Sequence, residues 1–294
     1  MSALKFLLPG VITQEEFDAI RIEVQEVAPG ILILVGLGGN IGVSYGEDET
    51  FMIDGQFGPL VEKILYPISK RAKKPVRYLL NTHWHLDHVA ANECFARHGV
   101  TIMAHEKVRS RMSVDQPLPA FECTVPAAPK EALPVITFRE NMSIHWNTDT
   151  IEIFHIPEAH TDGDVMVHFR KANVIHMGDI YFNGMYPLID VDCGGSVIGM
   201  IEAVDAVLSR CDGKTKIIPG HGPLSGYHEL KAYRAMLKEA AKTVADLIGQ
   251  GKSEEEAIAA KPTVLLDAQW GNGVLAPDAF VSQVYASLVQ STRL

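Results

Sequence analysis

The sequence lacks the segments that mark a membrane or secreted protein. No apolar run approaches the ~20 residues that cross a bilayer, and the apolar piece within residues 1–9 is shorter than a signal-peptide core of roughly 7–15 residues. The few cysteines stand without paired spacing, which favours a reducing compartment; they are Cys94, Cys123, Cys193 and Cys211. We expect no membrane association, and a cytoplasmic location unless a signal peptide has been removed, in which case the periplasm is expected.

Positive charge is also scarce, since 26 Lys and Arg stand against 36 Asp and Glu, for a formal net charge of −10. An acidic chain is poorly suited to a phosphate backbone, so nucleic acid is not an expected partner. The hydrophobic fraction of 47% over 294 residues is ample for a sizeable core. The charge does not identify a substrate, and the composition leaves the oligomeric state open; the small-molecule substrate that we expect follows from the motifs below.

Short apolar runs alternate with amphipathic segments, which is typical of an α/β or α+β layered domain. Predicted strands lie at 31–35, 51–54, 76–80, 101–104, 151–156, 165–169, 174–177 and 216–218. Predicted helices lie at 60–72, 88–98, 105–113, 196–210, 230–248 and 277–290, with a short helix starting at a Ser253–Glu256 capping box. Because no linker separates the last helices, we expect a single domain over 1–294, with a core at about 25–225 and a helical extension at about 228–294.

Two segments are predicted to be loops. Residues 36–42 are glycine-rich, but Ile41 stands where a dinucleotide-binding turn needs its third glycine, so a flexible hairpin or loop is expected. Residues 115–134 contain five prolines and little periodicity, which predicts a surface loop. We expect loops 36–46, 115–134 and 180–192 to form the substrate pocket.

The most informative stretch is Thr82-His-Trp-His-Leu-Asp-His88, which follows a predicted strand. His83 and His85 are separated by one residue, so their side chains project together from an extended backbone. Imidazole and carboxylate suit zinc and related metals. Because Asp87 and His88 follow at once, they can serve a second ion, and ligands for two adjacent ions indicate hydrolysis rather than a structural site.

Three later residues also follow predicted strands and have glycine nearby, namely His160, Asp179 and His221. Together with the first cluster they supply the ligands that two ions still need. The other histidines lack ligand spacing and are expected to be surface or core residues; they are His98, His105, His145, His155, His168, His176 and His228.

The ordered pattern His-x-His-x-Asp-His, then His, Asp and His, resembles the metallo-β-lactamase-fold hydrolases. The resemblance covers about 25–225 and includes Asp54, and it implies a four-layered αβ/βα sandwich with metals at one edge of two facing sheets. The ligands it implies are His83, His85 and His160 for a first ion, Asp87, His88 and His221 for a second, and Asp179 as a bridge. The histidine-rich set favours two Zn²⁺ ions, with iron or manganese as alternatives.

The sequence departs from the best-known zinc β-lactamases in three places. Those enzymes have cysteine at the position of Asp179, no histidine at His88, and a substrate-gripping lysine where Phe182 stands. Residues 183–210 nevertheless resemble that subclass. The resemblance therefore implies a broader metallo-hydrolase, with β-lactams among several carbonyl substrates.

The implied reaction is attack of a metal-bridging hydroxide on a carbonyl carbon, with Asp87 orienting the hydroxide and shuttling its proton. Asp54 is expected either to orient a ligand or to serve as a structural turn residue. A lactonase, or a thioesterase of the glyoxalase II kind, is an alternative on the same fold. A mononuclear iron persulfide dioxygenase is another, and a non-catalytic metal-binding protein is a third.

Overall fold

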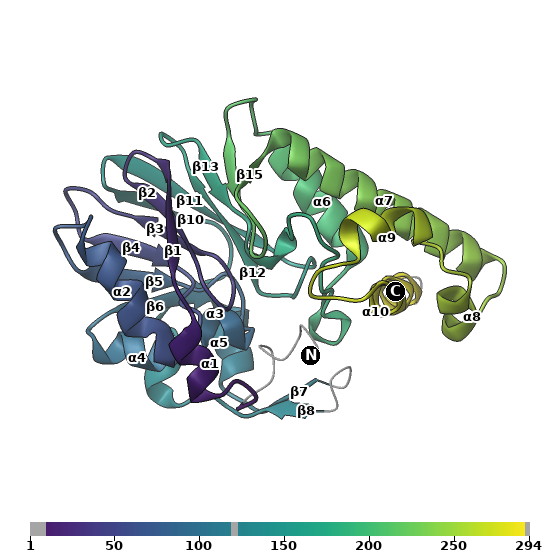
Figure 1. The fold of residues 1–294 in the computed structure, drawn as a ribbon, viewed down its shortest axis with the longest axis horizontal. Helices are drawn as coiled ribbons and strands as arrows, with labels where there is room; N and C mark the ends of the chain where they lie inside the picture. Colours follow the sequence, from purple (N-terminus) through teal and green to yellow (C-terminus); the bar gives the residue numbers. More distant parts are fainter. Residues whose placement is uncertain (1–9, 119–122, 292–294) are drawn as a thin grey trace.

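The computed structural model describes residues 10–118 and 123–291. The prediction made for residues 1–9 therefore lies outside the described residues, as does the part of the 115–134 loop between 118 and 123. Two sheets face each other, and helices cover the outer face of each (Figure 1). This is the αβ/βα sandwich that the sequence predicts, and the fold class is confirmed.

The first sheet has antiparallel strands at one side and parallel strands at the other. Its order is β1 (Glu23–Ala28), β2 (Ile31–Val35), β3 (Ile41–Ser44), β4 (Thr50–Ile53), β5 (Val76–Leu80), β6 (Thr101–His105) and β9 (Ile136–Phe138). The second sheet is antiparallel except for one parallel pair, β13 with β14. Its order is β10 (Met142–Trp146), β11 (Asp149–Ile156), β12 (Asp164–Phe169), β13 (Val174–His176), β14 (Lys216–Ile218) and β15 (Ser225–Gly226).

The side chains of β2 point alternately to the two faces of the first sheet, so this strand packs in two core layers. Ile31 and Ile33 pack in the core between the sheets, whereas Leu32 and Leu34 pack against the helices outside, because successive side chains point to opposite faces of a strand. All four are at most 3% exposed, and each fully buried aliphatic side chain contributes about 1.5–3 kcal/mol. The continuous apolar run of β2 is therefore the signature of a strand covered on both faces.

Helices form the two outer layers (Figure 1). Beside the first sheet lie α1 (Gln14–Ala19), η2 (Gly58–Leu60), α2 (Val61–Ser69), α3 (Leu86–Val89), α4 (Asn92–Arg97) and α5 (Glu106–Met112). The second half of the chain adds η5 (Gly178–Ile180), η6 (Val191–Cys193), α6 (Val197–Leu208), α7 (Tyr227–Gly249), α8 (Glu254–Ala259), α9 (Val264–Trp270) and α10 (Pro277–Ser291). The predicted caps are present, because Ser196 accepts from the Gly199 N–H and Ser253 forms a capping box with Glu256.

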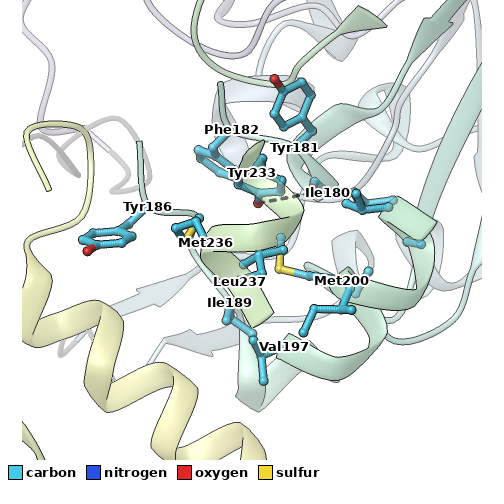
Figure 2. Close-up of a cluster of buried hydrophobic side chains, with 14 of the residues drawn as sticks. Ile180, Tyr181, Phe182, Tyr186, Ile189, Val197, Met200, Tyr233, Met236 and Leu237 are labelled. Carbon is cyan, nitrogen blue, oxygen red and sulfur yellow. Dashed lines mark hydrogen bonds between the residues drawn. The ribbon is translucent and has the colours of Figure 1, made fainter. Parts of the chain in front are cut away.

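The C-terminal helices share one apolar cluster with the second sheet. Figure 2 shows part of it, including Tyr233 on α7, whose hydroxyl donates to the backbone carbonyl of Ile180 at 3.2 Å. Phe280 and Val284 of α10 belong to the same cluster as Ile175 of β13. The extension is therefore packed onto the second sheet. No helix in the described ranges is long and apolar enough to cross a membrane.

Two predicted elements differ from the structure. The expected 88–98 helix is split into α3 and α4, because the His88 carbonyl accepts from Gly55 N–H and Ala91 N–H donates to the Gln56 carbonyl, so both groups bond outside the helix. The 115–134 segment is more structured than a loop, since β7 (Gln116–Leu118) pairs with β8 (Cys123–Val125) and η4 (Lys130–Ala132) follows.

Candidate metal centre

The structure brings all seven predicted ligands together at one edge of the facing sheets. They come from the segments that follow four strands: His83, His85, Asp87 and His88 after β5, His160 after β11, Asp179 after β13, and His221 after β14. All seven side chains are buried. The two sheets are joined at this edge by a backbone hydrogen bond of 2.9 Å from Val165 N–H to the Thr82 carbonyl.

His83, His85 and His160 form a first group that could hold a metal ion. The Nε2 atom of His83 lies 3.1 Å from Nδ1 of His85, and that Nδ1 lies 2.8 Å from Nε2 of His160. Three imidazole nitrogens facing one point form a set that suits zinc and neighbouring transition metals.

Asp87, His88 and His221 form another such group. The Oδ2 atom of Asp87 lies 3.2 Å from Nε2 of His221 and 3.4 Å from Nε2 of His88. Two imidazoles and one carboxylate converge here, which is a ligand set found in metal sites with an open position.

Asp179 lies between these two groups. Its Oδ1 is 3.1 Å from Nε2 of His88, while its Oδ2 is 3.3 Å from Nε2 of His221 and 3.6 Å from Nε2 of His160. One carboxylate therefore faces both groups, as the sequence-based hypothesis of a bridging ligand requires.

The chemistry of the donor set fits bound cations. Oδ1 and Oδ2 of Asp87, Oδ1 of Asp179 and Nε2 of His88 are buried and lack a well-aligned hydrogen-bond partner among the described residues. An unsatisfied buried polar group costs about 1–3 kcal/mol, and more when it is charged. Metal ions at this point would satisfy these atoms at once.

Hydrogen bonds behind the cluster fix the direction of the imidazoles. Nε2 of His85 lies 2.9 Å from the Asp190 carboxylate, and Nδ1 of His160 lies 2.7 Å from the Leu188 carbonyl. Each contact places the proton on the outward nitrogen, which leaves Nδ1 of His85 and Nε2 of His160 as lone-pair donors toward the centre.

Asp54 forms hydrogen bonds behind the group of Asp87, His88 and His221. Its carboxylate lies 2.8 Å from Nδ1 of His88 and accepts from both the backbone N–H and the hydroxyl of Thr82, each at 2.8 Å. Asp54 has a φ of 63°, in the left-handed region. Asp54 was expected either to orient a ligand or to serve as a turn residue. The structure supports the first role, since Asp54 orients His88, and it also places Asp54 in a turn.

Two glycines allow the backbone to approach the cluster. A Cβ on Gly39 would lie 2.0 Å from Cε1 of His88, and a Cβ on Gly220 would lie 2.0 Å from Oδ1 of Asp179. Gly39 belongs to the glycine-rich segment 36–42, which joins β2 to β3 as a hairpin. Gly39 therefore allows close packing of the backbone against His88.

The two groups have opposite protonation tendencies. Burial, with neighbouring His85, lowers the pKa of His160 to about 4, and burial also lowers that of His83. Burial also favours the neutral form of His221, but the carboxylates of Asp179 and Asp87 outweigh burial and raise the pKa of His221 to about 9. Neighbouring carboxylates likewise raise the pKa of His88. In the metal-free chain the low pKa values of His83 and His160 keep both residues neutral near pH 7, whereas His88 and His221 pair as imidazolium with carboxylates.

Sequence reasoning missed several residues that support the cluster. Asp190, Thr82 and the Leu188 carbonyl have no ligand-type spacing, and they reach the cluster only through tertiary contacts. Asp164 is another, because its carboxylate accepts from the backbone N–H groups of His160 and Thr161 at 2.7 and 2.8 Å. Among the described residues, none of the seven histidines judged to lack ligand spacing belongs to a metal-competent group.

These features define a class of protein: a four-layered αβ/βα fold with a buried His and Asp cluster that could hold metal ions at one edge of its sheets. Residues 34–251 match the Metallo-beta-lactamase superfamily. Since this match spans well over half of the chain, the chain belongs to the metallo-β-lactamase superfamily, and the family predicted from sequence is confirmed. Membership and the cluster together support a metal-dependent hydrolase in general.

Solved structures share the fold at low sequence identity. A metallo-β-lactamase from Pontibacter korlensis is 18% identical with a TM-score of 0.60, over 74% of this chain and 99% of that chain. The stereoselective inverting sec-alkylsulfatase Pisa1 from Pseudomonas sp. is 15% identical with a TM-score of 0.68, over 97% of this chain and 51% of that chain. At these identities the likeness concerns the fold alone.

A curated relative matches over a shorter stretch. The 2,4-dinitroanisole O-demethylase subunit alpha of Nocardioides sp. (strain JS1661) is 26% identical over 156 residues, which are 48% of this chain and 44% of that protein. The chain thus aligns with less than half the length of this relative.

Proposed function

We propose that the chain is a dinuclear metal-dependent hydrolase that cleaves a small carbonyl substrate. The observation that carries this proposal is the pair of ligand groups that share one edge of the fold and face Asp179 from two sides. Because each group supplies three protein ligands, the arrangement favours two ions over the single iron of a persulfide dioxygenase. Zinc is the proposed metal, since most of the ligands are imidazoles.

The residues have distinct roles in this proposal. His83, His85 and His160 would hold one ion, Asp87, His88 and His221 would hold the other, and Asp179, which lies between the two groups, would serve both. Two bound ions supply a water molecule that ionises near neutral pH and an electrophile that polarises the scissile group.

Asp87 is the proposed catalytic residue. Its Oδ2 faces His88 and His221, while its Oδ1 has no well-aligned partner among the described residues. Burial raises the pKa of this carboxyl group, but His88 and His221 outweigh that effect and keep the pKa below its ordinary value. The ionised Oδ1 is therefore able to orient the attacking water, accept its proton and return the proton to the leaving group.

Phe182 bears on the choice among carbonyl substrates. It is 1% exposed and stacks on the His221 ring, with centroids 5.0 Å apart and an angle of 19° between the planes. A buried aromatic ring at this point offers no charge to a substrate carboxylate. We therefore propose uncharged esters, lactones or thioesters as better substrates than β-lactams.

The test is a panel of chromogenic ester, lactone, thioester, β-lactam and sulfate-ester substrates, with metal analysis of each protein sample. Asp87→Asn is expected to lower kcat by at least about 100-fold, as loss of general acid–base catalysis does, and His160→Ala is expected to lose bound metal. His145→Ala, at an exposed histidine on β10, is the matched control. Full activity and full metal content in both site variants would refute the assignment.

A further inference from the structure

A cavity of about 160 Å³ lies beside the candidate metal centre and reaches it at His85. Its apolar wall includes Leu118 at the end of β7, Leu188 and Ile189 in the segment before η6, and Ala286 on α10. The C-terminal extension thus contributes directly to the space next to the proposed metal ligands, a role that no local sequence pattern indicates.

Two of the polar side chains in the cavity wall already form hydrogen bonds within the protein. Asp190 pairs with His85, and the amide oxygen of Gln283 accepts from the Ile189 N–H at 2.9 Å. Among the residues that the structure describes, no lysine or arginine lines the cavity, and Asp192, which does line it, is an exposed carboxylate. The cavity therefore offers apolar contact with negative charge nearby, which disfavours an anionic ligand.

The wall formed by α10 is fixed in place. The Val197 N–H donates to the hydroxyl of the buried Ser287 at 3.0 Å, and the rings of Tyr186 and Phe280 stack with centroids 4.3 Å apart. Figure 2 shows Tyr186 and Ile189 as members of the cluster that also contains α6 and α7 residues. Since these contacts join α10 to both neighbouring segments, the cavity is preformed and its size limits what it accepts.

The volume indicates the size of the ligand. A dry apolar cavity of roughly 150 Å³ is enough to hold benzene, so this cavity accommodates a phenyl ring or an alkyl chain of about six carbons. A substrate whose carbonyl group reacts at the metal centre would direct one substituent past His85 into this space.

We propose that the cavity binds the uncharged, apolar substituent of the substrate, so that the chain acts on neutral esters, thioesters or lactones with an alkyl or aryl group of about six carbons. This inference rests on the proposed hydrolytic function, which it narrows to one substrate class. It assigns a specificity role to α10, through Ala286.

The first test compares p-nitrophenyl esters that share a leaving group: acetate, hexanoate, benzoate and the adipate monoester, which has the chain length of hexanoate with a terminal carboxylate. We expect kcat/KM for hexanoate and benzoate to exceed that for acetate by about 10-fold or more, because each buried methylene contributes to transition-state binding. The adipate monoester is expected to fall about 10-fold or more below hexanoate. Equal values across the four esters would overturn the inference.

Variants of α10 test whether the preference for longer esters depends on the cavity. Ala286→Phe fills the cavity and is expected to lower the hexanoate-to-acetate ratio of kcat/KM by about 10-fold or more, with Ala286→Leu intermediate. Ala279→Phe, at an exposed alanine on the same helix, is the matched control and should keep the wild-type ratio. An unchanged ratio in a folded Ala286 variant would count against the proposed cavity.

A binding measurement separates this inference from the proposed function. Benzyl alcohol, a neutral probe of suitable size, is titrated by ligand-observed NMR into the wild type, Ala286→Phe and Ala279→Phe. Binding to the wild type and Ala279→Phe but not to Ala286→Phe supports the cavity even if no ester is cleaved, in which case only the hydrolytic proposal fails. Equal binding to all three, or to none, overturns the cavity assignment.

Discussion

The side-chain amide oxygen of Gln283 on α10 accepts a hydrogen bond from the backbone N–H of Ile189 at 2.9 Å. Ile189 lies between Leu188, whose carbonyl contacts His160, and Asp190, whose carboxylate contacts His85. A residue of the C-terminal extension is thus joined to the short segment that orients two of the first three proposed ligands.

Gln283→Met tests this connection. The substitution keeps the side-chain length but leaves the Ile189 N–H without its acceptor, which costs about 1–3 kcal/mol. Because loss of groups that orient metal ligands typically lowers affinity by about 10–100-fold, we expect weaker binding of the first ion, by roughly 10-fold, in a zinc titration.

Gln290→Met is the control for this variant, since Gln290 is exposed on the same helix. It should bind zinc as the wild type does. If Gln283→Met also retained wild-type affinity, α10 would have no positioning role at the centre.

Gly220→Ala tests the close approach of backbone to Asp179. The added Cβ would lie 2.0 Å from Oδ1 of Asp179, so the carboxylate has to move or the backbone has to shift. Overpacking of this kind costs about 1–3 kcal/mol, and we expect a lower thermal midpoint together with loss of metal binding.

Gly213→Ala is the matched control, because a Cβ there has no atom within 4 Å and the residue lacks a positive φ. Its thermal midpoint and metal content should equal those of the wild type. A normal metal content in Gly220→Ala would show that Asp179 does not need its present position.

The pH dependence of metal binding should differ between the two groups. Carboxylates outweigh burial and raise the pKa of His221 to about 9, and they also raise that of His88, so near neutral pH an ion must displace protons from both residues. Burial lowers the pKa of His160 to about 4 and also lowers that of His83, so an ion in the first group displaces few protons from these two residues near neutral pH.

Affinity for the second ion should therefore fall by about 10–100-fold per pH unit as pH is lowered from 8 to 6, while affinity for the first changes little. Calorimetric titrations in buffers of different ionisation enthalpy measure the protons released with each ion. Equal proton release for both ions would contradict the assigned protonation states.

The grouping of the proposed ligands could be predicted from sequence because four of them are nearly contiguous. His83, His85, Asp87 and His88 lie in one short stretch, so spacing alone indicates a metal site, and the strand-end positions of the later ligands follow from apolar runs. The same local patterns predict β2, β5 and α6 closely. What these elements have in common is that their signal lies within about ten residues.

Other features depend on contacts that no local pattern shows. Asp190 contacts His85 across 105 positions of the chain, and Gln283 contacts Ile189 across 94. β1 was missed because Glu23, Gln25 and Glu26 are exposed on an edge strand, which leaves little apolar alternation. The break between α3 and α4 was missed because it arises from hydrogen bonds of His88 and Ala91 to the distant residues Gly55 and Gln56.

The number of zinc ions that each chain binds distinguishes a dinuclear hydrolase from a mononuclear or metal-free protein. Metal-free protein is titrated with zinc at pH 8, and bound metal is measured after removal of the excess, for the wild type and for His221→Ala. A dinuclear centre predicts two ions per wild-type chain and one per variant chain, with hydrolysis lost in the variant. A single ion in both proteins, with activity unchanged by the substitution, would contradict it.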